Sequence, residues 1–129
     1  MLGRAVGAVG GGDELLEITE EPVDQVSCPE SLENVPDAYA VYVVGNSMEP
    51  RYFPGELLYI HPHKPHPKNS FVLVQIKNEV GQSPLGYVKQ FISLTPTRLI
   101  LRQLNPEKEI EFERSDVIAI HRVVGSSDL

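Results

Sequence analysis

The sequence predicts a mainly β domain, a small sandwich or barrel of short and mostly antiparallel strands. Short runs of β-branched and aromatic residues recur along the chain, and segments rich in turn-forming residues separate them. The 11 prolines and 10 glycines are scattered among these runs, which favours turns over long helices. With 129 residues, of which 41% are hydrophobic, the chain is long enough for one domain with its own core.

The expected strands follow the apolar runs in chain order. They are residues 15–18, 40–44, 57–61, 71–76, 86–92, 98–104, 109–113 and 117–124. Residues 20–36 are acidic and contain several prolines, so we expect a loop there, with one helical turn near residues 31–34. A second helical turn is expected over residues 48–53. The apolar strand at 117–124 would be an aggregation risk as an uncovered edge, and we expect it to help form a symmetric homodimer.

The N-terminal segment differs in composition from the rest. Residues 1–12 are mostly glycine, alanine and valine, so we expect an extended arm or linker. Residues 13–129 are then expected to form the folded domain.

Composition excludes several classes of function. The formal charge of −7 makes this chain a poor partner for a nucleic-acid backbone. Cys28 is the single cysteine, which rules out an internal disulfide and fits a reducing cytoplasm. No apolar run is long enough to span a membrane.

The segment with His61, His63 and His66 is broken by prolines and has no adjacent carboxylate or thiol, so we expect neither a metal nor a cofactor. His121 is interpreted as structural.

Residues 45–50, Gly-Asn-Ser-Met-Glu-Pro, follow directly on an expected strand. Gly45 and Asn46 tolerate backbone conformations that bulkier residues resist. The hydroxyl of Ser47 would then be held at a strand end beside backbone N–H groups, which suits a nucleophile with an oxyanion site. An ordinary turn with a capping serine is the alternative.

Lys89 lies in the expected strand at 86–92. Alternate residues of a strand share a face, so Tyr87, Lys89 and Phe91 are expected to project together and to place the amine between two rings. Burial disfavours a charged amine and lowers its pKa from about 10.4. A general base near neutrality would need a pKa lower by roughly three units. An exposed strand lysine is the alternative.

Four separated motifs together resemble the LexA-like family of self-cleaving Ser–Lys peptidases, in particular the C-terminal domains of phage-type repressors. They are the Gly-x-Ser-Met-x-Pro motif at 45–50, Gly55 before an apolar strand, the Val-Lys pair ending at Lys89, and residues 120–125. The sequence departs from the family at Glu56, where Asp is usual, and at Gln90, where Arg is common.

The resemblance implies specific roles. Ser47 would be the nucleophile, Lys89 the base, and the backbone N–H groups of Asn46 and Ser47 the oxyanion site. Residues 7–12 lie where the family carries Gly-x-Val-Gly-Ala-Gly, with Gly11 in place of the usual alanine, and this places the cleaved bond between Gly11 and Gly12.

The resemblance also implies a repressor that dimerises and cleaves itself when RecA filaments form on damaged DNA. DNA binding would belong to an N-terminal helix-turn-helix domain that this chain does not contain. Two alternatives stay open: a catalytically silent dimerisation and sensing module, and a signal-peptidase-like protease. The lack of any membrane-spanning or interfacial segment counts against the second.

Overall fold

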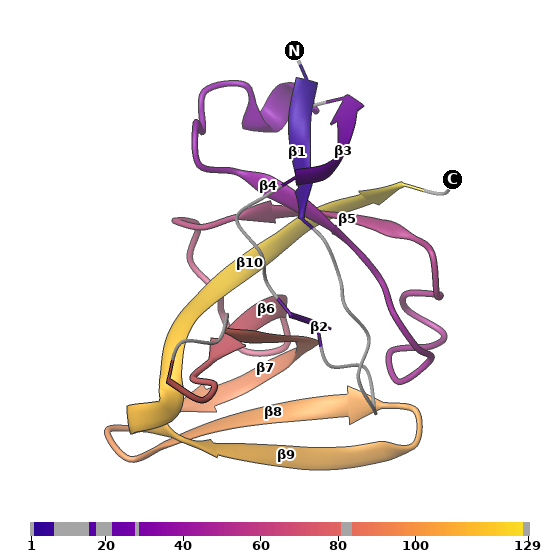
Figure 1. Cartoon of the computed structure of the whole chain (residues 1–129). Helices are drawn as coiled ribbons and strands as arrows, with labels where there is room; N and C mark the ends of the chain where they lie inside the picture. The colour runs from indigo at the N-terminus through magenta and orange to yellow at the C-terminus, as the bar shows by residue number, and fades with distance from the viewer. Residues whose placement is uncertain (1, 7–15, 18–21, 28, 81–83, 128–129) are drawn as a thin grey trace.

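A computed structural model of the chain is built almost entirely from β-strands (Figure 1). The structure describes residues 2–6, 16–17, 22–27, 29–80 and 84–127. Its strands are β1 (Leu2–Val6), β2 (Leu16–Glu17), β3 (Pro22–Ser27), β4 (Tyr39–Tyr42), β5 (Leu57–His61), β6 (Phe71–Ile76), β7 (Leu85–Leu94), β8 (Arg98–Leu104), β9 (Glu107–Glu113) and β10 (Val117–Ser127). Two short 3-10 turns, η1 (Glu30–Leu32) and η2 (Arg114–Asp116), are the helical elements of this described part. The predicted mainly β fold is confirmed.

The strands are joined in one hydrogen-bonded order, β3-β1-β4-β5-β10-β6-β7-β8-β9, and β2 pairs with β7 beside this path. All of the pairs are antiparallel except β1 with β4. The long strand β10 runs diagonally across the molecule and joins the β4–β5 half to the β6–β9 half (Figure 1).

The position of β10 bears on the aggregation risk that the sequence raised for residues 117–124. Residues 117–122 pair with β6 and residues 122–127 pair with β5, so β10 lies between these two strands in the strand order and not at an end of it. Its 11 residues are long enough to pair with two partners in succession, β6 along its first half and β5 along its second half. The two ends of the path are β3 and β9. The charged residues that alternate along β9 are a common protection against edge-to-edge pairing.

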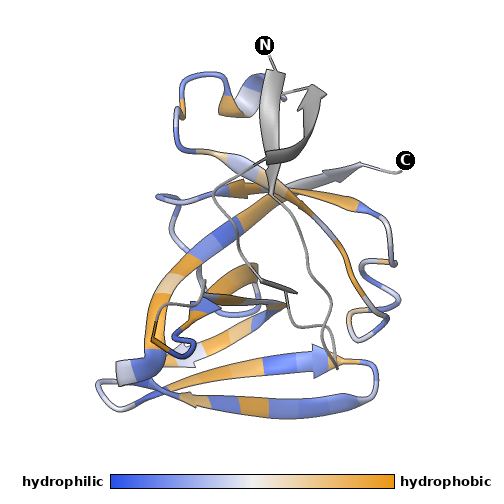
Figure 2. Cartoon of the chain, viewed as in Figure 1, coloured by the Kyte–Doolittle hydropathy of each residue, from blue (hydrophilic) through white to orange (hydrophobic). Residues whose placement is uncertain are grey.

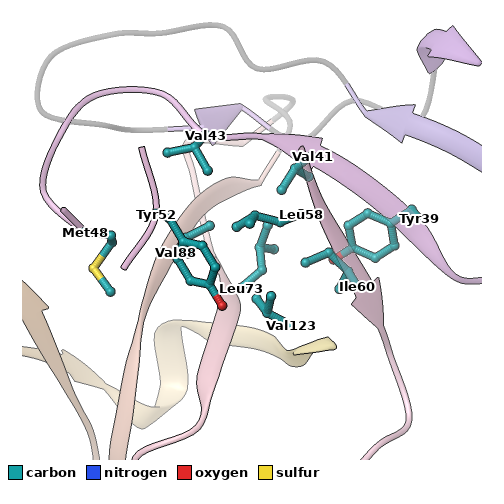
Figure 3. Packing of buried hydrophobic residues seen from close by; sticks show 10 residues of the cluster. All are labelled: Tyr39, Val41, Val43, Met48, Tyr52, Leu58, Ile60, Leu73, Val88 and Val123. Carbon is teal, nitrogen blue, oxygen red and sulfur yellow. The ribbon is translucent and has the colours of Figure 1, made fainter. Parts of the chain in front are cut away.

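The two larger clusters of the core share β6, β7 and β10, and a small third cluster is formed by Ala40 and Leu57. Leu73 on β6 belongs to the first cluster, whereas Val72 and Val74 belong to the second, because successive residues of a strand point to opposite faces. The strands around both clusters carry most of the hydrophobic colour (Figure 2). The first cluster comprises Tyr39, Val41, Val43, Met48, Tyr52, Leu58, Ile60, Leu73, Val88 and Val123 (Figure 3).

Two N-terminal strands were not expected. The prediction of a loop throughout residues 20–36 is wrong for residues 22–27, which form β3. Pro22 and Asp24 disfavour a strand on local grounds, but β3 is the terminal strand of the path, and an edge tolerates a proline at its first residue. Strand β1, within the expected arm, pairs with both β3 and β4. The domain boundary between residues 12 and 13 stays a prediction.

The other elements lie close to their expected places. β5, β6 and β8 begin and end at the expected residues, and β7, β9 and β10 are longer. β4 covers residues 39–42 rather than 40–44. Beyond it, the Val43 carbonyl accepts a hydrogen bond from the Gly55 N–H at 2.9 Å, so the chain stays paired while it enters the turn that carries Ser47.

Candidate active site

Ser47 lies in a tight turn that is anchored in the first core cluster. Gly45 enters the turn with φ of +79°, a left-handed conformation that favours glycine. The N–H groups of Arg51 and Tyr52 donate to the Met48 carbonyl at 2.8 and 2.9 Å and close a single turn in the expected region. Met48 and Tyr52 are both buried in the cluster (Figure 3). Packing therefore fixes the turn from its inner side.

The end of β8 holds the same turn through its backbone. The Ser47 carbonyl accepts hydrogen bonds from the N–H groups of Leu104 at 3.1 Å and Asn105 at 2.7 Å. The side chain of Asn105 donates from Nδ2 to the Asn46 carbonyl at 3.0 Å. These bonds fix the turn relative to the β8–β9 hairpin.

The structure brings Ser47 and Lys89 together across 42 residues of sequence. Nζ of Lys89 donates a hydrogen bond to Oγ of Ser47 at 2.7 Å. Both side chains are buried, with 3% of Lys89 and 5% of Ser47 exposed. This distance is within the range required for direct proton transfer between a nucleophile and its base.

Gln103 is a third buried polar residue at this site, and sequence reasoning missed it. Its Oε1 accepts a hydrogen bond from Lys89 Nζ at 3.2 Å, and its Nε2 donates to the Pro106 carbonyl at 3.2 Å. The second bond fixes the amide with its oxygen toward the amine. A signal was present in the sequence, since Gln103 continues the buried face of β8 formed by Leu99 and Leu101.

The aromatic neighbours of Lys89 pack into the second cluster. Phe91 contacts His66, with ring centroids 4.6 Å apart, and Tyr87 contacts Phe112 at 5.2 Å. The Lys89 amine itself donates hydrogen bonds to Oγ of Ser47 and Oε1 of Gln103.

The two departures from the family pattern make contacts away from the Ser47–Lys89 pair. Glu56 accepts a hydrogen bond from the Phe53 N–H at 3.0 Å and so braces the turn before β5. Gln90 donates to the Asn69 carbonyl at 3.0 Å. As neighbours in a strand, Gln90 and Lys89 point to opposite faces.

The expected oxyanion donors lie in the same turn as Ser47. Within the described part of the chain, the N–H groups of Asn46 and Ser47 donate no hydrogen bond. Gly11, Gly12 and Cys28 lie outside the described residues, so their predicted roles are not tested.

The histidines make other contacts. His121 Nδ1 lies 2.7 Å from the Tyr39 hydroxyl. Burial lowers the pKa of His121 and raises the pKa of Tyr39, so the tyrosine donates and the neutral imidazole accepts. The fold brings Asp37 to His63, although no carboxylate is adjacent to that histidine in sequence. Among the residues described, no group of three or more His, Cys, Asp or Glu side chains could hold a metal ion.

Comparison with known proteins identifies the family. Residues 5–124 match the model of the family described as peptidase S24-like. Repressor protein C of Rhizobium phage 16-3 is 45% identical over 120 residues, which cover 91% of this chain and 46% of that repressor. The chain thus spans about half the length of this relative. None of the helices in the described residues is long and apolar enough to cross a membrane. Because the family match extends over nearly all of its length, the chain belongs to the peptidase S24-like family.

Proposed function

We propose that this chain is the self-cleaving and dimerising domain of a LexA/CI-like transcriptional repressor, with residues 1–12 as its cleavage arm. The observation that carries the proposal is the buried contact of 2.7 Å between Lys89 Nζ and Ser47 Oγ. Membership of the peptidase S24-like family and likeness to a phage repressor support it.

In the proposed reaction, the uncharged amine of Lys89 accepts the hydroxyl proton of Ser47 while Oγ attacks the carbonyl carbon of Gly11. The N–H groups of Asn46 and Ser47 stabilise the oxyanion that forms. The bond to the Gly12 nitrogen then breaks, and the Lys89 ammonium returns the proton to the departing amine. Water hydrolyses the resulting ester and regenerates Ser47.

The strands on either side of the proposed cleavage segment favour cleavage within one chain. β1 ends at Val6 beside Val41, and β2 begins at Leu16 beside Gly86, three residues before Lys89 on β7. If the chain before Leu16 extended this antiparallel register during cleavage, residue 13 would come opposite Lys89. The proposed bond would then lie within two residues of that point. A segment tethered at both ends also has a high effective concentration, so a weak catalyst suffices.

Likeness to a phage repressor protein supports the wider biological proposal. A helix-turn-helix domain on the N-terminal side would bind the operator, and two linked copies would bind two half-sites with avidity. Cleavage at Gly11–Gly12 would separate the halves and weaken binding. We propose RecA filaments on damaged DNA as the stimulus and the cytoplasm as the location. The acidic charge of −7 fits a chain that leaves DNA contacts to another domain.

The decisive experiment is mass spectrometry of the purified chain before and after incubation near pH 10, with Ser47→Ala in parallel. We expect the parent mass to be replaced by the two fragments of residues 1–11 and 12–129, and only in the chain that retains Ser47. An intact wild-type chain would contradict self-cleavage and favour a silent dimerisation and sensing module. Cleavage of an added peptide in trans would favour a signal-peptidase-like enzyme.

A further inference from the structure

A pocket of about 270 Å³ lies between the turn after Ser47, the loop over residues 62–70, β6 and β10. Three cationic side chains line it, namely Arg51, Lys64 and Arg122. Tyr52 and Val123 also line it. Both belong to the first core cluster (Figure 3). Ser47 and Lys89 are not among its lining residues, so the pocket is separate from the candidate active site.

Both arginines are held by uncharged partners. The Arg51 guanidinium lies over the Tyr52 ring at 4.4 Å and within 5.4 Å of the Phe71 ring centroid. The two rings are themselves packed edge to face, which gives the guanidinium a fixed platform. Arg122 donates from Nη1 to the Pro65 carbonyl at 2.8 Å. These contacts fix the positions of both groups without neutralising either charge.

The positive charge of the pocket is unbalanced. Within the described residues, none of the ion pairs involves Arg51, Lys64 or Arg122, whereas Arg98 and Arg102 on β8 each pair with a glutamate. Nε of Arg122 is buried and has no acceptor among the described protein atoms. A buried donor without a partner costs free energy, and more so when it carries charge. In a chain with a net charge of −7, three unpaired cations at one pocket indicate a site for an anion.

We propose that this pocket binds a phosphate group, either as free phosphate or as a phosphate monoester. A tetrahedral dianion offers several acceptors for guanidinium and ammonium donors, which form short and strong charge-assisted bonds with it. The lining residues include three positively charged side chains and no carboxylate. A ligand with a single carboxylate carries one negative charge and would balance only one of them. A bound phosphate would accept from Arg122 Nε and would join β10 to the turn that carries Arg51.

The test is an NMR titration of the Ser47→Ala chain, which separates the result from any self-cleavage. Sodium phosphate is compared with sodium chloride at equal ionic strength, while the arginine Nε–H signals are followed. We expect a saturable shift of the Arg122 signal, assigned by its loss in Arg122→Lys. A parallel titration with a nucleoside 5′-monophosphate distinguishes the two sources, since tighter binding than phosphate would identify an ester as the ligand.

Matched variants locate the site. Arg51→Gln and Lys64→Gln change exposed residues at the pocket, and each is expected to weaken phosphate binding by about tenfold. Arg98→Gln makes the same change in net charge on β8, where Arg98 pairs with Glu111, and it should bind like the parent. The proposal is overturned if phosphate produces no more shift than chloride, if Arg98→Gln weakens binding equally, or if both pocket variants bind normally.

Discussion

The side-chain oxygen of Gln103 lies 3.2 Å from the amine nitrogen of Lys89, which in turn lies 2.7 Å from the hydroxyl oxygen of Ser47. Gln103 is near the end of β8, and the next two residues donate their N–H groups to the Ser47 carbonyl. One short segment therefore holds both members of the proposed catalytic pair, the amine through a side chain and the serine through its backbone. We infer that Gln103 is a positioning residue for Lys89.

Replacing Gln103 by Glu tests this role through the pH profile of self-cleavage. A carboxylate beside the amine favours the charged ammonium, so the pKa of Lys89 in the variant rises. The rate should fall at neutral pH and recover in alkaline solution, with the profile displaced upward by about one pH unit or more. The measurement is the rate of fragment formation between pH 7 and pH 10.5.

Gln90→Glu is the matched control for that experiment. It makes the same chemical change on β7, at the residue next to Lys89, but its side chain faces the other way and donates to the Asn69 carbonyl. Its pH profile should overlie that of the wild type. If Gln103→Glu slowed cleavage by the same factor at every pH, without displacing the profile, the role of Gln103 would be structural only.

Ser47→Ala and Lys89→Ala are each expected to abolish self-cleavage and to leave the fold intact. The first removes the proposed nucleophile and the second removes the only proposed base, so neither loss is compensated by the other group. In the wild type, the rate should rise with pH, because only an uncharged amine accepts the serine proton. Fragment formation followed by gel or mass spectrometry gives the rate, and circular dichroism checks the fold. Wild-type cleavage by either variant, or a flat rate from pH 7 to pH 10, would exclude this pair.

Replacing Gly11 by Ala should accelerate cleavage, with the larger fragment beginning at Gly12. A glycine costs more backbone entropy to hold in an extended conformation and offers no side chain to bury beside Ser47. N-terminal sequencing of the fragment identifies the bond. A different first residue, or slower cleavage by the variant, would show that the bond has been placed wrongly.

Stability should decrease below about pH 6.5 because of His121. Burial lowers its pKa below the ordinary value of 6.5, while the charge of Asp37 acts in the opposite direction. The unfolded chain then binds the proton first, so the contribution of neutral His121 is complete above pH 6.5 and is lost as the pH falls toward its folded pKa. The slope in this window is at most about 1.4 kcal/mol per pH unit. Urea unfolding from pH 5 to pH 8 measures it.

His121→Gln should flatten that pH dependence, because the amide can still accept a hydrogen bond from Tyr39 but does not titrate. The comparison variant is His63→Gln, which removes an exposed histidine whose charge adds to burial in lowering the pKa of His121, and its flattening should be the smaller of the two. A flattening of equal size in both variants would assign the effect to the Asp37 neighbourhood in general and not to burial of His121.

The chain is expected to form a homodimer with β10 or its neighbours in the interface. The contact would use exposed side chains of β10, among which Ile118 is 49% exposed. Ile118→Glu should weaken the dimer by placing a charge in an apolar contact. Leu94→Glu, at another exposed apolar residue, serves as the control. The prediction would be contradicted if sedimentation of the wild-type chain at high micromolar concentration showed only monomer.

Local sequence determined most of the strands and the identity of the candidate residues. β5, β6 and β8 begin and end where their apolar runs do, because an apolar run between turn-forming residues is a property of a few neighbouring residues. The turn at Ser47 could likewise be recognised from its own residues, since Gly45 supplies a backbone conformation that few other residues adopt.

Tertiary structure alone decided the contacts that join distant segments. β3 forms at an edge despite Pro22, since its pairing with β1 outweighs a weak local preference. The long strand β10 joins the two halves of the strand order because its first half pairs with β6 and its second half with β5. Gln103 reaches Lys89, and Arg51 comes to the same pocket as Arg122, because strand pairing and core packing bring together residues that are far apart in sequence. No local pattern encodes such contacts, because they depend on how complete strands are arranged in space.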